Sequence, residues 1–402
     1  MSNIDNSETF CVNPYLNLSI HPSGVVKACC MIDKEYITDD GYQTLDKSSI
    51  LKFWNSKDRQ KMIQDLNNGN RINECRACWN EEKAGKESKR IRDNKKYQDR
   101  VLDSTMLPVV LDLSMGNLCN IKCRICSPVH STPWMIEESK IINNPKYFKN
   151  EKWKSFKDSF LENNSFVWDD IEKLLPNAEH LDFAGGEPFY IDKHWNIIDM
   201  CVKNGWSKKQ YIHYNTNGTI FPEEHIYIFE EFKFVDIQIS SDGIEKKFEY
   251  LRHPANWNKV ENNIQRFIDA KNNSNTDWLL SICISISAFN VYYMFETFEH
   301  YASKGIGIYI NLVHDNRGIK ILPSKIKQKI IDHLMSFESQ HMPLQWKKDR
   351  DMVCRHLKST SFNPDPWKMF LDEIELRDKV RNESFPDTFP DFYKMIKNNG
   401  AL

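Results

Sequence analysis

The sequence lacks an excess of charge of one sign and lacks any long hydrophobic run. Lys and Arg number 54 against 56 Asp and Glu, for a formal net charge of −2. No overall electrostatic field therefore favours nucleic acid or a membrane surface as a partner. No apolar run approaches the ~20 residues of a membrane span, and the polar, acidic start from Met1 to Phe10 is unlike a secretory signal. We therefore expect a cytoplasmic protein that binds neither nucleic acid nor a membrane.

Cysteine, in contrast, is plentiful, with 11 in 402 residues. In a chain without a secretory signal, grouped cysteines favour metal ligation over disulfides. Most of them fall into two groups, one within residues 11–78 and one within Cys119–Cys126. The chain is long enough for one large α/β domain and a smaller one.

The later group, Cys119, Cys123 and Cys126, follows the spacing C-x3-C-x2-C in a stretch that predicts a loop leaving a strand. One short loop of this kind can fold three thiolates around one metal centre. Zinc or a cubane cluster normally takes a fourth ligand, and none is nearby. A cubane held by three cysteines leaves one iron open to a substrate or cofactor. A zinc site or three buried thiols is the alternative.

The earlier group surrounds a predicted hairpin. Leu16 to Ile20 alternates as a strand does, and Val25 to Cys29 returns after a turn. Together with an upstream cysteine and a C-x2-C knuckle, this hairpin can bring four thiolates to one metal, from Cys11, Cys29, Cys75 and Cys78. Cys30 is the alternative to Cys29, because adjacent strand residues face opposite ways. Four thiolates suit a cluster or a structural zinc.

Six strand-like runs recur after residue 107, separated by polar, helix-compatible segments. They are Pro108 to Ser114, His180 to Phe183, Gln210 to Tyr214, Phe234 to Ser240, Leu279 to Ser287 and Ile306 to Val313. Alternating strands and helices predict a parallel sheet with right-handed crossovers. Residues 81–107 predict a solvated, charged helical linker. Two amphipathic helices, Ile321 to Met342 and Trp367 to Ile396, are expected to cover the open edge of the sheet.

Polar motifs follow these strands at their carboxyl ends, which is the edge where parallel sheets built from alternating strands and helices carry their active sites. Gly185 and Gly186 let backbone approach a ligand closely, and the neighbouring carbonyls with Glu187 offer acceptors for an ammonium group. Asn215 and the following Thr216, after the third strand, and Ser240 at the end of the fourth offer amide and hydroxyl groups that can hydrogen-bond a ligand without adding charge. The alternative for each is an ordinary turn or helix cap.

Together these motifs resemble the radical S-adenosylmethionine (SAM) enzymes, and the earlier cysteine group resembles the SPASM/twitch module attached to them. The resemblance implies an α/β fold with a partial (β/α)6 TIM-like barrel in residues 108–320. A small β-hairpin/helix iron–sulfur module, residues 1–80, and a charged linker, residues 81–107, would precede it, and a helical segment, residues 321–402, would follow. The module usually follows the barrel, and many members carry an aromatic where this chain has Ile125.

The resemblance also implies the cofactors and the residues around them. A 4Fe–4S cluster on Cys119, Cys123 and Cys126 would bind SAM through its open iron. An auxiliary 4Fe–4S cluster would be held by the four cysteines of the earlier group. The residues that would border SAM are Gly185, Gly186, Glu187, Asn215, Thr216, Ser240, Arg252, Ser285 and Ile125.

The implied function is reductive cleavage of SAM to a 5′-deoxyadenosyl radical that abstracts hydrogen from a substrate, expected to be a peptide or protein side chain. One alternative is the same chemistry on a small molecule such as an amino sugar. Another is a non-catalytic iron–sulfur or zinc protein. An electron donor such as flavodoxin or ferredoxin is the expected partner. The residues identify no catalytic acid or base.

Overall fold

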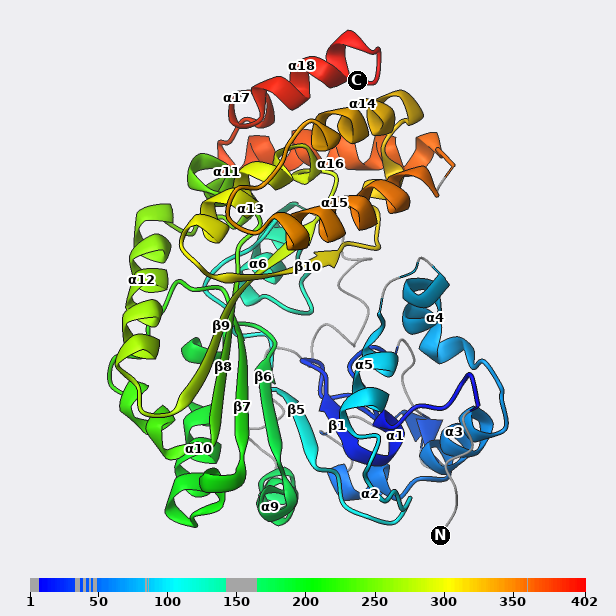
Figure 1. Cartoon of the computed structure of the whole chain (residues 1–402), viewed down its shortest axis with the longest axis vertical. Coiled ribbons are helices and arrows are strands. Elements are labelled where there is room, and N and C mark those ends of the chain that lie inside the picture. Colours follow the sequence, from blue (N-terminus) through cyan, green and yellow to red (C-terminus); the bar gives the residue numbers. More distant parts are fainter. Residues whose placement is uncertain are drawn as a thin grey trace.

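The computed structural model describes residues 7–32, 37–38, 41–42, 45, 49–83, 85, 87–141, 165–359 and 361–402. Within these residues, one eight-stranded sheet runs through the molecule, and a two-stranded sheet lies apart from it. Helices flank the large sheet and gather at one end of the molecule (Figure 1). No described helix is long and apolar enough to cross a bilayer.

Six strands of the large sheet are parallel and follow one another in chain order. They are β5 (Val110–Ser114), β6 (His180–Ala184), β7 (Tyr211–Thr216), β8 (Phe234–Ser240), β9 (Asp277–Ile286) and β10 (Gly307–Leu312). The predicted parallel sheet of six units is therefore confirmed. Because the strands are parallel and sequential, all of their carboxyl ends meet at one edge, where the polar motifs were expected.

Burial alternates along the middle strands, as a strand with two different faces requires. In β6, β7 and β8 every second residue is fully buried, whereas the residues between are half-buried. The buried residues belong to the hydrophobic core and the half-buried ones are largely polar. The connecting helices are α9 (Ser165–Leu174), α10 (Lys193–Lys203), α11 (Glu245–Leu251), α12 (Trp257–Asn273) and α13 (Met294–Ser303).

The N-terminal part contains the predicted hairpin and several short helices. Strand β1 (Asn17–Ile20) pairs antiparallel with β2 (Val26–Lys27). The helices are α1 (Asn13–Leu16), α2 (Ile50–Trp54), α3 (Lys57–Asn67), α4 (Arg76–Lys83) and α5 (Lys89–Lys96), and the small sheet is β3 (Ile37–Thr38) with β4 (Gly41–Tyr42). All four residues of β1 also pair in parallel with β5. The hairpin thus continues the barrel sheet, rather than standing in a unit of its own as expected.

Helix α5, within the predicted solvated linker of residues 81–107, is exposed on one side and attached to the hairpin unit on the other. Arg90 on this helix is buried, pairs with Glu82 at 2.8 Å and donates to the carbonyl of Phe10 at 2.8 Å. Asn94 accepts from the backbone N–H of Val12 at 2.8 Å. The bonds to Phe10 and Val12 attach α5 to the residues before the hairpin. The pair with Glu82 compensates the charge of Arg90, which would be costly to bury alone.

The C-terminal helices are α14 (Ser324–Met335), α15 (Pro343–Lys358), α16 (Pro364–Arg381), α17 (Phe385–Thr388) and α18 (Pro390–Asn398). They form a cap at one end of the molecule (Figure 1). The side chain of Gln345 in α15 donates to the carbonyl of Ile308 in the edge strand β10. Helix α15 lies between the two helices predicted from the sequence and was not itself predicted. Helix α16 also contacts the loop after β5, because its Asp378 forms an ion pair with Arg124 at 2.6 Å.

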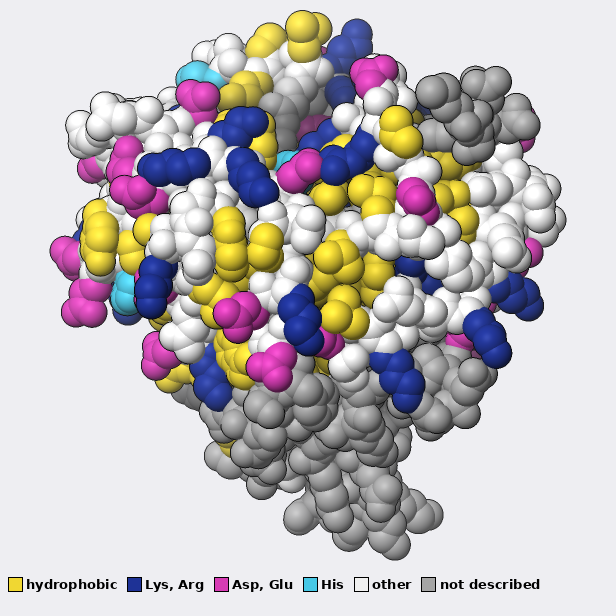
Figure 2. Space-filling view, turned by 90° about the horizontal axis from the view of Figure 1, so that it is seen from below, with side chains coloured by type: hydrophobic (Ala, Val, Ile, Leu, Met, Phe, Trp, Pro, Cys, Tyr) yellow, Lys and Arg dark blue, Asp and Glu magenta, His cyan; other side chains and the backbone are white. Residues whose placement is uncertain are grey.

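The face opposite this cap, viewed from below the orientation of Figure 1, has a mixed character. Figure 2 shows hydrophobic side chains grouped toward the middle of this face, with Lys, Arg, Asp and Glu side chains dispersed among and around them. Charges of both signs are interspersed here, in line with the small net charge of the chain.

Candidate functional site

The loop after β5 carries Cys119, Cys123 and Cys126, all three as free thiols. Its backbone is pinned from two other loops. The N–H group of Lys122 donates to the carbonyl of His253, just after α11, and that of Arg124 donates to the carbonyl of Leu251 at the end of α11, each at 2.7 Å. The guanidinium of Arg317, after β10, donates to the carbonyl of Cys126 at 2.7 Å. The loops that follow β5 and β10 thus meet at the carboxyl end of the sheet, although the two strands themselves are not paired.

Two side chains outside the loop aim donors at its sulfur atoms. The Asn217 amide lies 3.8 Å from the Sγ of Cys119, and a guanidinium nitrogen of Arg252 lies 3.9 Å from the Sγ of Cys123. Burial raises the pKa of the Cys119 thiol to about 12, with a further contribution from the charge of Cys123. Burial likewise raises the pKa of Cys123, and Arg252 opposes this rise. The thiols are therefore kept neutral until a cation joins them.

The residues present at the cysteine loop are compatible with an iron–sulfur cluster. Among the described residues, no three His, Cys, Asp or Glu side chains converge as ligands of one metal ion. A tetrahedral zinc requires its thiolates to converge on one point. In a cubane each thiolate binds a different iron, so the sulfur atoms stand further apart. One buried thiol, Cys119, and two half-buried ones, Cys123 and Cys126, with N–H donors beside two of the three sulfur atoms, fit this second case.

The glycine loop after β6 touches the cysteine loop directly. Gly185 and Gly186 have φ of 78° and 55°, a conformation that glycine adopts without strain. A Cβ on Gly186 would stand 2.2 Å from the carbonyl oxygen of Leu118, and one on Gly185 would stand 2.7 Å from the Cβ of Ser114. The paired glycines are therefore required for the close approach of the two loops, whatever ligand they also face.

Glu187 has a different role from the expected one. The side chain is 0% exposed, and its carboxylate accepts from the Thr216 hydroxyl and the Asn217 N–H, both at 2.7 Å. Its own N–H donates to Leu118. Burial raises the pKa of Glu187 to about 7, although these hydrogen bonds oppose the rise. Glu187 therefore connects the glycine loop with the cysteine loop and with the residues at the end of β7. The acceptors that remain for an ammonium group at this position are backbone carbonyls.

The other expected SAM-binding residues lie around the carboxyl end of the sheet. Asn215 shares a 3.0 Å contact with the ring of His213, while Ser240 and Ile125 are half-buried. Arg252 pairs with Asp242 at 2.7 Å. The same carboxylate accepts from the N–H of Ser285 at 2.8 Å. Arg252 is thus engaged on both sides, by a carboxylate and by a cysteine sulfur.

Sequence reasoning missed Asn217 and Asp242 as partners of this site. Both stand inside motifs already singled out, immediately after Thr216 and two residues after Ser240. Asn217 is buried and Asp242 almost fully so. A buried polar residue at the end of a strand is the signal that points to them, because such a group needs a partner.

A row of polar residues across the sheet was also missed. Ser19, Asp112, Asp182, His213 and Asp236 occupy matching positions on neighbouring strands. The ring of His213 bonds Asp236 at 2.8 Å, and the Ser19 hydroxyl donates to Asp112 at 2.9 Å. Burial lowers the pKa of His213, but the hydrogen bond to Asp236 and the nearby carboxylates outweigh it and raise that pKa. Each is a polar residue between two apolar neighbours in its strand, which is a readable signal.

The N-terminal cysteines also come together in part. Cys11, Cys29 and Cys78 are buried, Cys75 is half-buried and Cys30 is exposed. Burial raises the pKa of Cys11 to about 12, and the charges of Cys75 and Cys78 raise it further. Three of the four expected thiols are thus close enough to act on one another.

Comparison with known families finds one match. Residues 11–79 match the SPASM family, described as an iron–sulfur cluster-binding domain. This span contains Cys11, Cys29, Cys75 and Cys78. The expectation of a SPASM-like iron–sulfur module in the N-terminal part is therefore confirmed. No curated protein sequence matches the chain.

Solved structures give a broader likeness at low identity. One is titled "Native anSMEcpe with bound AdoMet and Cp18Cys peptide", with 16% identity, a TM-score of 0.37, and coverage of 62% of this chain and 61% of that one. Another, "Native anSMEcpe with bound AdoMet and Kp18Cys peptide", has 17% identity, a TM-score of 0.38, and coverage of 63% and 62%. The alignments thus span less than two thirds of each solved chain.

Proposed function

We propose that the chain is a radical SAM enzyme whose reaction begins at Cys119, Cys123 and Cys126. The observation that carries this is the position of the three-thiol loop. It lies at the carboxyl end of six parallel strands, in contact with the glycine loop after β6 and with N–H donors aimed at two of its sulfur atoms. When bound, a 4Fe–4S cluster with SAM supplies a 5′-deoxyadenosyl radical that abstracts hydrogen from a substrate C–H bond.

The residues of the chain would hold and orient these groups. Backbone carbonyls at Gly185 and Gly186 would accept from the SAM ammonium group, while the hydrogen bond from Thr216 to Glu187 helps to hold the glycine loop in position. The polar side chains at the ends of neighbouring strands would border the nucleoside, from Asn215, Ser240 and Ser285. Arg252 offers its charge to the Cys123 thiolate, and Ile125 offers an apolar contact beside the loop.

The N-terminal cysteines would hold an auxiliary 4Fe–4S cluster, with Cys11, Cys29, Cys75 and Cys78 as its ligands. The SPASM match over residues 11–79 supports this assignment, and the burial of Cys29 beside an exposed Cys30 favours Cys29 as the fourth ligand. Pairing of β1 with β5 holds the module firmly against the barrel. The substrate we propose is a peptide or protein side chain, and the electron donor is a flavodoxin or ferredoxin.

The test is formation of 5′-deoxyadenosine by the anaerobically reconstituted chain with dithionite and SAM, followed by chromatography. Cys119→Ala, Cys123→Ala and Cys126→Ala should each abolish the product, because each removes one of three cluster ligands. Cys201→Ala is the matched control, since this thiol is buried in α10 and should leave product formation intact. A chain loaded with iron and sulfide that forms no product, or a Cys123→Ala variant that does, contradicts the proposal.

A further inference from the structure

A pocket of about 630 Å³ opens beside the cysteine loop, between helix α6 (Thr132–Ile141), the loop after β10 and helix α16. Its floor includes Cys126, and none of the residues expected to border SAM lines it. The pocket is therefore distinct from the proposed SAM site, although both lie against the same loop. Its volume suits an organic molecule or one long side chain.

Much of the pocket wall is apolar and firmly held. Trp134 and Phe370 are 4% and 1% exposed, and Leu376 adds a further apolar side chain. The indole N–H of Trp134 donates to the carbonyl of Cys123 at 2.6 Å, so the ring is fixed to the cysteine loop. The wall thus offers a rigid surface for an apolar stem.

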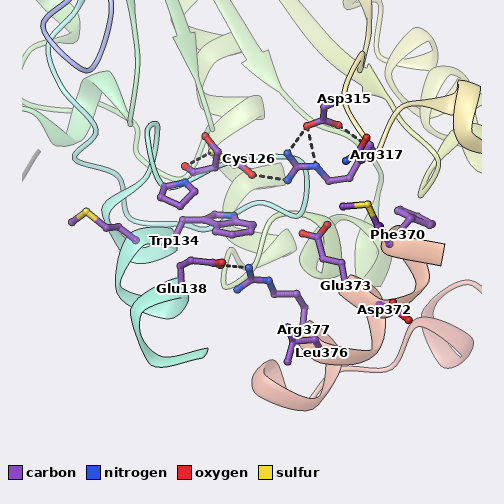
Figure 3. Close-up of a pocket in the computed structure, with 15 residues that line it drawn as sticks. Cys126, Trp134, Glu138, Asp315, Arg317, Phe370, Asp372, Glu373, Leu376 and Arg377 are labelled. Carbon is purple, nitrogen blue, oxygen red and sulfur yellow. Dashed lines mark hydrogen bonds and ion pairs between the residues drawn. The ribbon is translucent and has the colours of Figure 1, made fainter. Parts of the chain in front are cut away.

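The cations around the pocket already have carboxylate partners. Arg317 binds Asp315, and Arg377 binds Glu138 as well as the buried Glu137. Arg124, behind them, binds Asp378 at 2.6 Å and also Glu383. Figure 3 shows the first two of these pairs at opposite sides of the pocket. Both cations that line the pocket are therefore neutralised within the protein.

Glu373 is the carboxylate without such a partner. It forms no hydrogen bond or ion pair with any residue that the structure describes, and Figure 3 shows its carboxylate pointing into the pocket toward Trp134. Burial raises the pKa of Glu373, although the charges of Arg317, Arg377 and Arg124 oppose the rise. A partly buried carboxylate in this position is stabilised by a cation that enters the pocket.

We propose that this pocket binds an organic cation, an ammonium or guanidinium group on an apolar stem, with the charge at Glu373 and the stem against Trp134 and Phe370. Such a group is carried by a basic side chain of a peptide substrate or by a free amine. Assignment to a substrate side chain rests on the proposed function. Cation binding itself does not, because it needs only residues of the pocket.

Calorimetric titration of the reconstituted full chain with benzylamine and with the neutral benzyl alcohol tests the proposal. Benzylamine should bind with 1:1 stoichiometry, and benzyl alcohol should bind at least about tenfold more weakly because it lacks the charge. Glu373→Gln should weaken benzylamine by a similar factor and leave benzyl alcohol unchanged, which also shows that the pocket is intact. Glu375→Gln is the matched control, an exposed carboxylate on the same helix outside the pocket.

Equal affinity for the alcohol and the amine, or full benzylamine affinity in Glu373→Gln, overturns the proposal. The source of the cation is distinguished with the peptide acetyl-Gly-Lys-Gly-amide and its norleucine counterpart. Binding of the lysine peptide above the norleucine peptide assigns the pocket to a substrate chain, whereas benzylamine binding alone assigns it to a free amine. Neither result depends on 5′-deoxyadenosine formation, so failure here and failure of the proposed enzyme are separate outcomes.

Discussion

Arg252 stands between the buried carboxylate of Asp242 and the sulfur of Cys123, so a change of this residue acts on the proposed cluster. N–H donors to cysteine sulfur raise the reduction potential of an iron–sulfur cluster, because they stabilise the more negative reduced state. Arg252→Lys keeps the charge beside Asp242 but loses the planar fork that reaches the sulfur. We expect a lower reduction potential at unchanged iron content, measured by an EPR-monitored redox titration.

Arg266→Lys is the matched control for this prediction. Arg266 pairs with Glu223 at 3.0 Å, on the surface, and its replacement should leave the potential unchanged. An unchanged potential in Arg252→Lys would show that the 3.9 Å contact with Cys123 carries no weight once a cluster is bound.

Glu187 shows where prediction of single residues from sequence reaches its limit. The motif correctly placed two glycines and a carboxylate after a strand. The sequence could not show that the carboxylate turns inward, because its partners Thr216 and Asn217 follow the next strand in the chain. The direction of a polar side chain depends on which donors the fold brings beside it. The three cysteines of one short loop needed no such long-range information.

At the scale of loops, the approach of the glycine loop to the cysteine loop gives a sharp prediction for Gly186→Ala. The added Cβ would meet the carbonyl oxygen of Leu118 at a positive φ. We expect a loss of roughly 2–5 kcal/mol from backbone strain and steric overlap, together with lower iron content, because the cysteine loop must shift. Urea unfolding and an iron assay measure the two effects.

Gly205→Ala is the matched control, because it introduces backbone strain without steric overlap. Gly205 has a φ of 71° and nothing within 4 Å of an added Cβ, so this variant should lose only about 1–2 kcal/mol and keep its iron. Equal losses in both variants would mean that the contact with Leu118 is not what demands glycine at position 186.

Secondary-structure elements were predicted well where local pattern suffices. Each of the six parallel strands is an apolar or alternating run of its own, and all six form. Half of α5 is exposed, as a solvated helix would be, but the pattern of mixed charge does not reveal that Arg90 turns inward to Glu82 and Phe10. Charge composition predicts solvent exposure on average and says little about a single helix that meets a buried carbonyl.

At the scale of the whole molecule, the pairing of the N-terminal hairpin with the barrel sheet could not be predicted from the sequence. Strand β1 is only four residues long and pairs with β5 more than ninety residues later. The sequence of neither strand indicates which strand it will pair with, because parallel pairing depends on how the fold brings distant segments together. The consequence is functional, because the proposed auxiliary-cluster module is joined by backbone hydrogen bonds to the strand that leads into Cys119, Cys123 and Cys126.

One buried carboxylate joins helix α6 to helix α16 of the C-terminal cap, which makes this contact sensitive to acid. Glu137 in α6 is 3% exposed and binds Arg377 and Arg381 of α16 at 2.8 and 2.9 Å. Burial acts to raise the pKa of Glu137, but the hydrogen bonds and charges of Arg381 and Lys122 outweigh it and lower that pKa to about 2. Since the folded pKa lies below the unfolded value, this carboxylate stabilises the fold above about pH 4.5 and loses that effect toward pH 2.

Glu137→Gln should therefore cost about 3 kcal/mol at pH 7, because it leaves the buried Arg381 without its carboxylate and Arg377 with Glu138 alone. The loss should shrink as the pH falls from 5 toward 2, since the wild-type carboxylate becomes protonated over that range. Urea unfolding at a series of pH values measures both effects. Asp372→Asn, at an exposed pair with Lys368, should change stability by less than about 1 kcal/mol at every pH. A Glu137→Gln loss that stays constant from pH 7 to pH 2 would show that packing, and not charge, joins α16 to the barrel.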